Sequence, residues 1–191
     1  MEKQNKAEPA YHEMVQSSFE EFRQKHEKYG PTLTILRLWS IAEQIYIKML
    51  RVRTIQEKKT QKVDEPIRNE FSGIYNYSVF LKIKIHCIKE GLDIVKIYEE
   101  NPFPLYERAL GEIEELHVRK THDYGDAWKK MSVSTMIDLM LVKFERFRSI
   151  YLNEKIGERD KLDDYAEIAS DIANYAIFSK ILINQGVDPM K

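Results

Sequence analysis

Near its C-terminus the chain carries three carboxylates whose spacing could bind a metal ion. Asp164, Glu167 and Asp171 lie three and four residues apart, so an α-helix would place them on one face, followed there by Asn174 and Phe178. Grouped carboxylate oxygens are ligands for hard cations such as Mg²⁺. The rest of this segment is mostly apolar, which is typical of a buried helix, and buried carboxylates need a metal or cationic partners. The sequence leaves a metal site and a salt-bridged face both open.

Basic residues that could hold phosphate precede this acidic segment. Lys143, Arg146 and Arg148 form a Lys-x-x-Arg-x-Arg motif, which also occurs at residues 48–53. The guanidinium of Arg matches two phosphate oxygens and Lys supplies a point charge, so these cations could bind a phosphate chain beside the carboxylates. Pairing with the acids of a neighbouring helix is the structural alternative, and the sequence does not decide between the two.

A turn motif lies upstream of the basic residues. Residues 123–128 read Asp-Tyr-Gly-Asp-Ala-Trp, and the Lys-x-x-x-Tyr-Gly pattern that overlaps them also occurs at residues 25–30. The glycine is expected to end a helix, and Ser134 is the expected N-cap of the next one. Asp123 could assist at the metal site. Trp128 could stack on a base or lie in the core.

The helix before this turn offers a second pair of acids. Glu112 and Glu115 are spaced i, i+3 and could share a metal, or they could simply be solvated. His117 lies on the apolar stripe of the same segment and is interpreted as a core or interface residue. Cys87 has no His or Asp pattern around it that would indicate a nucleophile.

The chain also contains an internal repeat. Residues 25–55 align without a gap with residues 120–150, and residues 72–85 align with residues 170–183. Two units are too few for a solenoid. We therefore interpret them as two related halves packed around one core, in the manner of a fused dimer.

The two halves differ at the acidic positions. Pro66, Asn69 and Gly73 replace the three carboxylates of the last segment, whereas Asn76 and Phe80 are kept. Carboxylates needed only for folding would be expected in both halves. The comparison predicts that the chemistry lies in the second half and that the first half is a degenerate copy.

Composition predicts an all-α protein, because Pro and Gly are few, helix-forming residues are abundant and no convincing alternating strand pattern occurs. The Asn-Pro-Phe-Pro sequence at residues 101–104 predicts the boundary between a first half, residues 1–101, and a second half, residues 102–191. Each half is expected to form a three-helix unit, and the two units to pack as one pseudo-dimeric helical bundle. The expected helices cover residues 11–28, 41–57 and 66–90 in the first half, where Gly91 interrupts the third before a further helical piece at 92–100, and residues 105–122, 134–153 and 163–184 in the second.

Charge and hydropathy exclude several classes of partner. The formal net charge of −1 gives no electrostatic footprint for a nucleic-acid polymer or an anionic membrane. No apolar run reaches the roughly 18 residues needed to cross a bilayer. A single cysteine cannot form an internal disulfide and fits a reducing compartment, and the polar N-terminal segment is unlike a signal peptide. We therefore expect a cytoplasmic protein.

The ordered set of motifs resembles the nucleotide modification associated domain 1 family of bacteria and phages. In the second half the resemblance is carried by the Asp-Tyr-Gly-x-x-Trp turn, by Asp138 with Lys143 and Arg146, and by the Asp-Ile-Ala-Asn-Tyr sequence at residues 171–175. The first half contributes Tyr-Gly-Pro at residues 29–31 and related segments. The resemblance covers nearly the whole chain from about residue 20, including the tandem arrangement.

This family is similar to MazG-type all-α nucleoside triphosphate pyrophosphohydrolases, which hold Mg²⁺ with Glu-x-x-Glu and Glu-x-x-Asp motifs. The resemblance implies a MazG-like fold, a nucleotide substrate and self-association as a homodimer. Glu112-x-x-Glu115 has the first spacing, but Glu167 and Asp171 are one residue further apart than the second requires. The residues implied are Glu167 and Asp171 for catalysis; Glu115, Asp123, Asp164, Glu167 and Asp171 for Mg²⁺; and Lys143, Arg146, Arg148, Trp128 and Asn174 for the substrate.

Three functions therefore follow as alternatives. The first is a Mg²⁺-dependent nucleoside triphosphate pyrophosphohydrolase, in which the metal would polarise the attacked phosphorus and the basic residues would stabilise the transferring group. The second is a non-catalytic nucleotide-binding module that keeps the fold and the basic pocket. The third is a purely structural helical module with salt-bridged faces.

Overall fold

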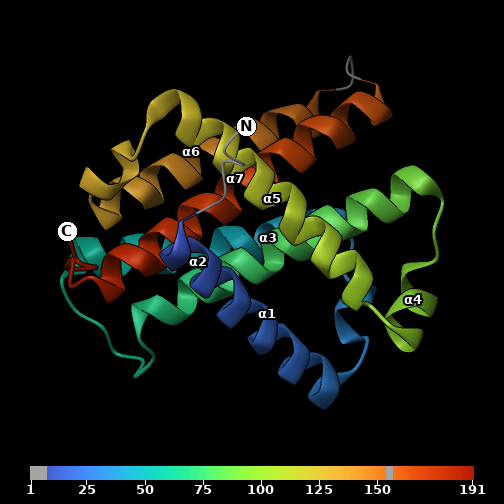
Figure 1. Ribbon diagram of the computed structural model, residues 1–191, viewed down its shortest axis with the longest axis horizontal. Coiled ribbons are helices and arrows are strands. Elements are labelled where there is room, and N and C mark those ends of the chain that lie inside the picture. The colour runs from blue at the N-terminus through green and yellow to red at the C-terminus, as the bar shows by residue number, and fades with distance from the viewer. Residues whose placement is uncertain (1–7, 154–156) are drawn as a thin grey trace, which may run out of the picture.

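The computed structural model describes residues 8–153 and 157–191, and over these residues it is helical with no strand. The all-α prediction is therefore confirmed. Figure 1 shows the helices gathered around two long central ones. In chain order the elements are α1 (Pro9–Tyr29), the 3₁₀ turn η1 (Thr32–Ile35), α2 (Leu38–Lys58), α3 (Ile67–Glu90), α4 (Ile94–Glu100), α5 (Phe103–Tyr124), the 3₁₀ turn η2 (Ala127–Lys130), α6 (Val133–Leu152) and α7 (Glu158–Asn184).

The order of elements repeats between the halves. The series α1, η1, α2, α3 has the same sequence of element types as α5, η2, α6, α7, and only α4 has no counterpart. The sequence did not predict either 3₁₀ turn. The N-cap of α6 is Ser132, whose hydroxyl accepts a hydrogen bond from the Thr135 amide, so the assignment of that role to Ser134 was wrong.

The antiparallel pair α3 and α7 forms the centre of the fold. At one end of the pair the Arg68 guanidinium donates to Asn184 over 2.9 Å, and at the other end Lys89 pairs with Asp163. Helix α2 packs on α3, α6 packs on α7, and α2 and α6 also contact each other. This arrangement makes the four helices one body. The finer MazG-like arrangement stays a prediction.

Helices α1 and α5 each cross from one half to the other. The Tyr11 hydroxyl of α1 donates to Asn174 of α7 over 2.6 Å, although the C-terminal part of α1 lies beside α3. In the equivalent contact, the Tyr106 hydroxyl of α5 donates to Asn76 of α3 over 2.8 Å. The same pair of residue types therefore joins the halves twice, and each first helix interlocks them.

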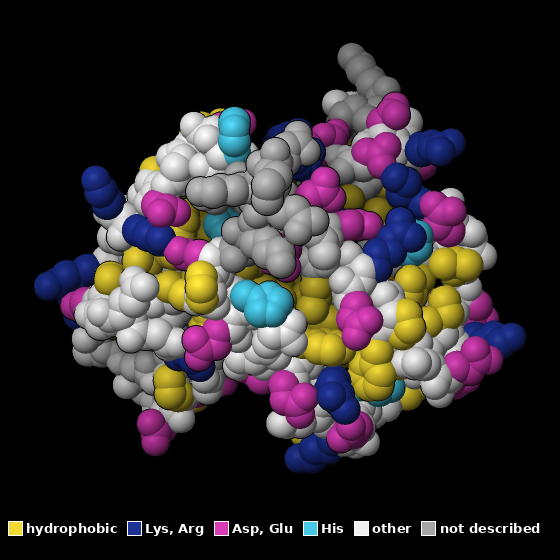
Figure 2. Space-filling model, in the orientation of Figure 1, with side chains coloured by type: hydrophobic (Ala, Val, Ile, Leu, Met, Phe, Trp, Pro, Cys, Tyr) yellow, Lys and Arg dark blue, Asp and Glu magenta, His cyan; other side chains and the backbone are white. Residues whose placement is uncertain are grey.

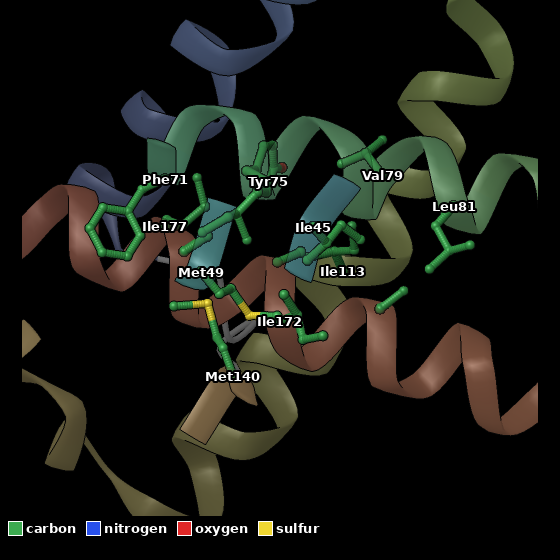
Figure 3. Packing of buried hydrophobic residues seen from close by; sticks show 14 of the residues in the cluster. Ile45, Met49, Phe71, Tyr75, Val79, Leu81, Ile113, Met140, Ile172 and Ile177 are labelled. Atoms are coloured by element: carbon green, nitrogen blue, oxygen red, sulfur yellow. The ribbon is translucent and has the colours of Figure 1, made fainter. Parts of the chain in front are cut away.

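A single hydrophobic core draws on both halves. Buried side chains of α2, α3 and α5 meet those of α6 and α7 in Figure 3. Burial of these groups away from water is the main force that holds the helices together. The residues seen there include Ile45, Met49, Phe71, Tyr75, Val79, Ile113, Met140, Ile172 and Ile177.

The face of the molecule in Figure 2 carries both positive and negative side chains. Lysine and arginine side chains are interspersed with aspartate and glutamate over the face in Figure 2. Among the described residues, no helix is long and apolar enough to cross a membrane.

Two buried tyrosines are expected to respond in opposite directions to loss of the hydroxyl. In the described part of the chain the Tyr75 hydroxyl is buried without a hydrogen-bond partner, so Tyr75→Phe should raise the free energy of unfolding by about 1 kcal/mol. Tyr11→Phe should lower it by about 1 to 2 kcal/mol, because the buried Asn174 loses its donor. Urea denaturation measures both changes, and equal destabilisation by the two variants would contradict the expectation.

Candidate functional site: two related pockets

Two pockets lie at equivalent positions in the two halves. The first has a cavity volume of about 610 Å³ and is lined by α1, η1, α2, α3 and the segments around them, with Tyr98 added from α4. The second has a volume of about 370 Å³ and is lined by α5, η2, α6 and α7. Equivalent residues face both cavities: Lys25 and Lys120, Tyr29 and Tyr124, Gly30 and Gly125, Lys48 and Lys143, Asn76 and Asn174, Tyr77 and Tyr175.

The Lys-x-x-x-Tyr-Gly motif shapes one wall of each pocket. It places the lysine on the last turn and a half of the first helix of each half, and the glycine ends that helix. Gly30 and Gly125 have φ angles of 61° and 60°, which any residue with a Cβ adopts at a cost. Their amides close the last helical turn on His26 and Thr121. The glycine lets the chain turn at once into the 3₁₀ element that lines the same pocket.

In the second pocket the lysines are bound to a carboxylate of the protein itself. Asp171 of α7 is only 2% exposed. Lys120 of α5 donates to its Oδ1 atom, and Lys143 Nζ lies 2.6 Å from its Oδ2 atom as an ion pair without hydrogen-bond alignment. Two cations thus offset the cost of burying this carboxylate.

The aromatic wall of the second pocket is largely packed into the protein. Trp128 of η2 stacks on Phe178 with ring centroids 4.4 Å apart, and its Nε1 atom is buried without a partner among the described residues. His117 stacks on Tyr11 at 4.1 Å. Burial lowers the pKa of His117, which favours its neutral form. Trp128 therefore belongs to the core and lines the pocket at once.

In the first pocket, glycine stands where the second has Asp171. The aliphatic stem of Lys48 passes directly over Gly73, since a Cβ added there would lie 2.6 Å from Lys48 Cε. Lys48 Nζ pairs instead with Glu70, 3.2 Å away, and Arg51 binds the other Glu70 oxygen. Glu70 is 3% exposed. The inference that the first half has lost its acids was therefore incomplete, because a carboxylate at a different position serves these cations.

Polar groups of the first pocket are left without partners. The Tyr98 hydroxyl and the Asn76 Nδ2 atom are buried and make no hydrogen bond within residues 8–153 and 157–191. Lys25, whose side chain is exposed at the rim, forms no ion pair within the same ranges. Both polar atoms of Asn174, the counterpart of Asn76, have partners, because Oδ1 accepts from Tyr11 and Nδ2 donates to the Ile113 carbonyl. Unpartnered buried donors in a cavity are groups that a bound ligand can satisfy.

A buried lysine supports the back of the first pocket. Lys180 of α7 is fully buried; its Nζ donates to the Ser18 hydroxyl over 2.9 Å and lies 3.9 Å from Glu21. Glu21 lines the pocket and also accepts a hydrogen bond from Ser72. Desolvation lowers the pKa of Lys180 to about 8, although the nearby Glu21 acts in the opposite direction.

The remaining residues predicted for the site are dispersed. Arg146 pairs with Asp164 at 2.9 Å. Arg148 lies 3.9 Å from Glu145 in an exposed pair, and Asp123 contacts His122. Glu115 and Glu167 are exposed and do not line the second pocket. Of the predicted set, the second pocket brings together Lys143, Trp128, Asp171 and Asn174.

The carboxylates predicted to bind Mg²⁺ lie apart from one another in this structure. No group of three or more His, Cys, Asp or Glu side chains in the described ranges is placed to hold a metal ion. Asp171, the only predicted metal ligand in the second pocket, already binds two lysines. In this structure Asp171 is therefore engaged in ion pairs, and Mg²⁺ binding by these carboxylates stays a prediction.

Sequence reasoning missed the pocket role of Lys25, Lys120, Tyr29 and Tyr98. The first three belong to the Lys-x-x-x-Tyr-Gly motif, whose retention in both halves was the available signal. Its glycine was interpreted as a helix stop, which is correct, but the motif also places the lysine over the cavity. Nothing in the sequence marks Tyr98, since α4 has no counterpart in the second half.

Comparison with known proteins agrees with the repeat. Residues 25–85 and 120–183 match the family described as nucleotide modification associated domain 1, and together these segments make up more than half of the chain. No curated protein and no solved structure matches the chain.

Proposed function

This chain belongs to the nucleotide modification associated domain 1 family, and from that premise and the geometry of the first pocket we propose that it binds a nucleotide there without needing to transform it. The observation that carries the proposal is the larger cavity, which the exposed Lys25 lines together with Asn76 and Tyr98, whose buried amide and hydroxyl groups have no partner among the described residues. The ligand class is a nucleoside phosphate.

The phosphate end of the ligand is assigned to the two lysines. Lys25 and Lys48 come from different helices and both line the cavity. Lysine ammonium groups donate hydrogen bonds to phosphate oxygens, and charge-assisted bonds of this kind are stronger than neutral ones. Lys48 is also paired with Glu70, so Lys25 carries the larger share of uncompensated positive charge. Two cations suit one or two phosphate groups better than a long polyphosphate chain.

The base is assigned to the aromatic part of the same cavity. Tyr29, Tyr77 and Tyr98 line it together with Phe22 and His26. Aromatic side chains can stack on a purine or pyrimidine ring, and their polar edges can hydrogen-bond to it. The volume of about 610 Å³ lies within the range of pockets that hold small molecules.

Charge supports a small nucleotide rather than a nucleic-acid polymer. The chain has a formal net charge of −1, and the face in Figure 2 mixes both signs of charge. Polymer binding generally needs a continuous basic surface. The hydrolase alternative has weaker support, because the carboxylates it requires are dispersed or paired with lysine.

Substitution of Lys25 tests the proposal. Titration calorimetry with a panel of nucleoside 5′-mono- and triphosphates should give saturable binding to the unmodified protein, and Lys25→Ala should weaken it about tenfold or more through loss of a charge-assisted contact. Lys96→Ala is the matched control, because Lys96 lies exposed on α4 and does not line the pocket.

Two outcomes of this titration would overturn the proposal: no nucleotide of the panel binds the folded protein, or Lys25→Ala binds as tightly as the control. The same panel incubated with Mg²⁺ and assayed for pyrophosphate release tests the hydrolase alternative. Turnover that is lost in Asp171→Asn, with the fold retained, would favour that alternative.

A further inference from the structure

We infer that Asp171 occupies the anion position of the second pocket, so that the second half contains a closed copy of the nucleotide site. The protein then has one open site and one site blocked by its own carboxylate. This inference extends the proposed function, because it takes the first pocket as the reference for an open site.

The contacts of Asp171 are those expected of a bound phosphate. Lys120 and Lys143 converge on its two carboxylate oxygens from α5 and α6. These lysines are the counterparts of Lys25 and Lys48, which line the first cavity, where Lys48 pairs with Glu70 beside the cavity and Lys25 has no carboxylate partner among the described residues. A carboxylate and a phosphate group can both be held in this way, with anionic oxygens between two ammonium groups. A phosphate that entered this place would be repelled by the negative charge of Asp171.

The first half shows what the same position looks like without the carboxylate. Gly73 has no side chain, and the Lys48 stem fills the space over it. The first cavity is also the larger one, about 610 Å³ against about 370 Å³. Replacement of one glycine by one aspartate therefore accounts for a local difference in charge between the two pockets.

Other features of a binding site remain in the second pocket. Tyr124 and Tyr175 line it, and Tyr124 is strongly exposed. Gly125 keeps the positive φ angle of Gly30. Removal of the negative charge at residue 171 should therefore free two lysines in a cavity that is already formed. The first pocket should not be affected by this change.

Glycine amides allow each pocket to be observed separately. Gly30 lines the first pocket and Gly125 the second. The chain has only seven glycines, so selective ¹⁵N-glycine labelling gives a simple spectrum in which both amides can be followed. The probe is inorganic phosphate, titrated at constant ionic strength into the full chain, into Asp171→Asn and into Gly73→Asp.

The expected pattern is reciprocal. In the unmodified protein phosphate should shift the Gly30 amide saturably and leave Gly125 unchanged, whereas in Asp171→Asn it should shift both. In Gly73→Asp the new carboxylate should capture the lysines of the first pocket and weaken the Gly30 response about tenfold or more. The Lys48 stem is flexible and can move aside. If Asp171→Asn does not fold, Asp171→Gly reproduces the residue of the first half and serves in its place.

A saturable shift of Gly125 in the unmodified protein would overturn the inference, and so would the absence of a Gly125 shift in a folded Asp171 variant. A different outcome would contradict the proposed function alone. If Gly30 never responds but Gly125 responds in the Asp171 variant, the first pocket is not an anion site although Asp171 still blocks the second.

Discussion

Replacing Lys180 with methionine is expected to stabilise the protein at neutral pH, and this advantage should shrink by roughly 3 kcal/mol between pH 7 and pH 10.5. Lys180 is fully buried in α7, and burial lowers its pKa to about 8 from an ordinary value of 10.5. Methionine has a similar length and carries no charge, so it removes the desolvation cost.

The direction follows from the protons bound in each state. Below pH 8 the ammonium is protonated in both the folded and the unfolded chain, so the folded state carries the full cost of burying the charge. Between pH 8 and pH 10.5 the folded chain has released this proton while the unfolded chain still holds it, so stability rises with pH. Above pH 10.5 both forms are neutral and the contribution no longer changes.

Urea denaturation at several pH values measures this dependence. Lys82→Met is the matched control, because Lys82 is the aligned lysine of α3, is paired with Glu112 at 3.0 Å, and its replacement leaves Lys180 in place. The control should keep the rise in stability between pH 8 and pH 10.5. Parallel pH profiles for Lys180→Met and the unmodified protein would show that burial does not shift the pKa of Lys180.

Truncation of Ile74 or of Ile172 to alanine is expected to lower the free energy of unfolding by about 3 kcal/mol in each case. These aligned isoleucines lie on α3 and α7 and are both almost fully buried in the shared core. Each variant should still unfold in a single transition, because the two halves share that core and neither has one of its own.

Calorimetry distinguishes one cooperative unit from two domains. Ile88→Ala is the control, since Ile88 is exposed on α3 and its truncation should change stability little. Two separated transitions, with only one of them shifted by each variant, would mean that residues 1–101 and 102–191 unfold as independent domains. A much smaller loss at one of the two sites would mean that the halves pack unequally.

The helices were predictable because their signals are local. Few prolines and glycines, apolar residues at helical spacing and the glycine stops at Gly30, Gly91 and Gly125 indicate where helices end. The crossing of α1 and α5 was not predictable, because it depends on Tyr11 and Tyr106 reaching residues of the other half. No short-range pattern carries that information.

The site was only partly predictable, and the reason is electrostatic. The sequence placed the carboxylates on one face of a helix. The cation that pairs with each of them depends on which side chains of other helices come close in the folded protein. Lys120 joins Asp171 from the helix that carries Glu115, where the sequence argument considered the acids and not this lysine. Glu70 binds cations of the first half from a position that aligns with Ile168 rather than with an acid. Aligning identical positions detects residues that are kept. It cannot detect a carboxylate that pairs with the equivalent cations from a different position on the helix.

The crossing of α1 has a consequence for how the chain folds during synthesis. Tyr11 bonds Asn174, a residue 163 positions later, so this contact cannot form until nearly the whole chain has left the ribosome. Contacts of such long range slow folding because a large loop must close first. Until then the part of α1 that packs on α7 lacks this cover, including Met14, whose Sδ atom accepts a hydrogen bond from Asn184 of α7 in the folded protein. The nascent first half is thus a candidate for chaperone binding during translation, and the arrival of α7 ends that exposure.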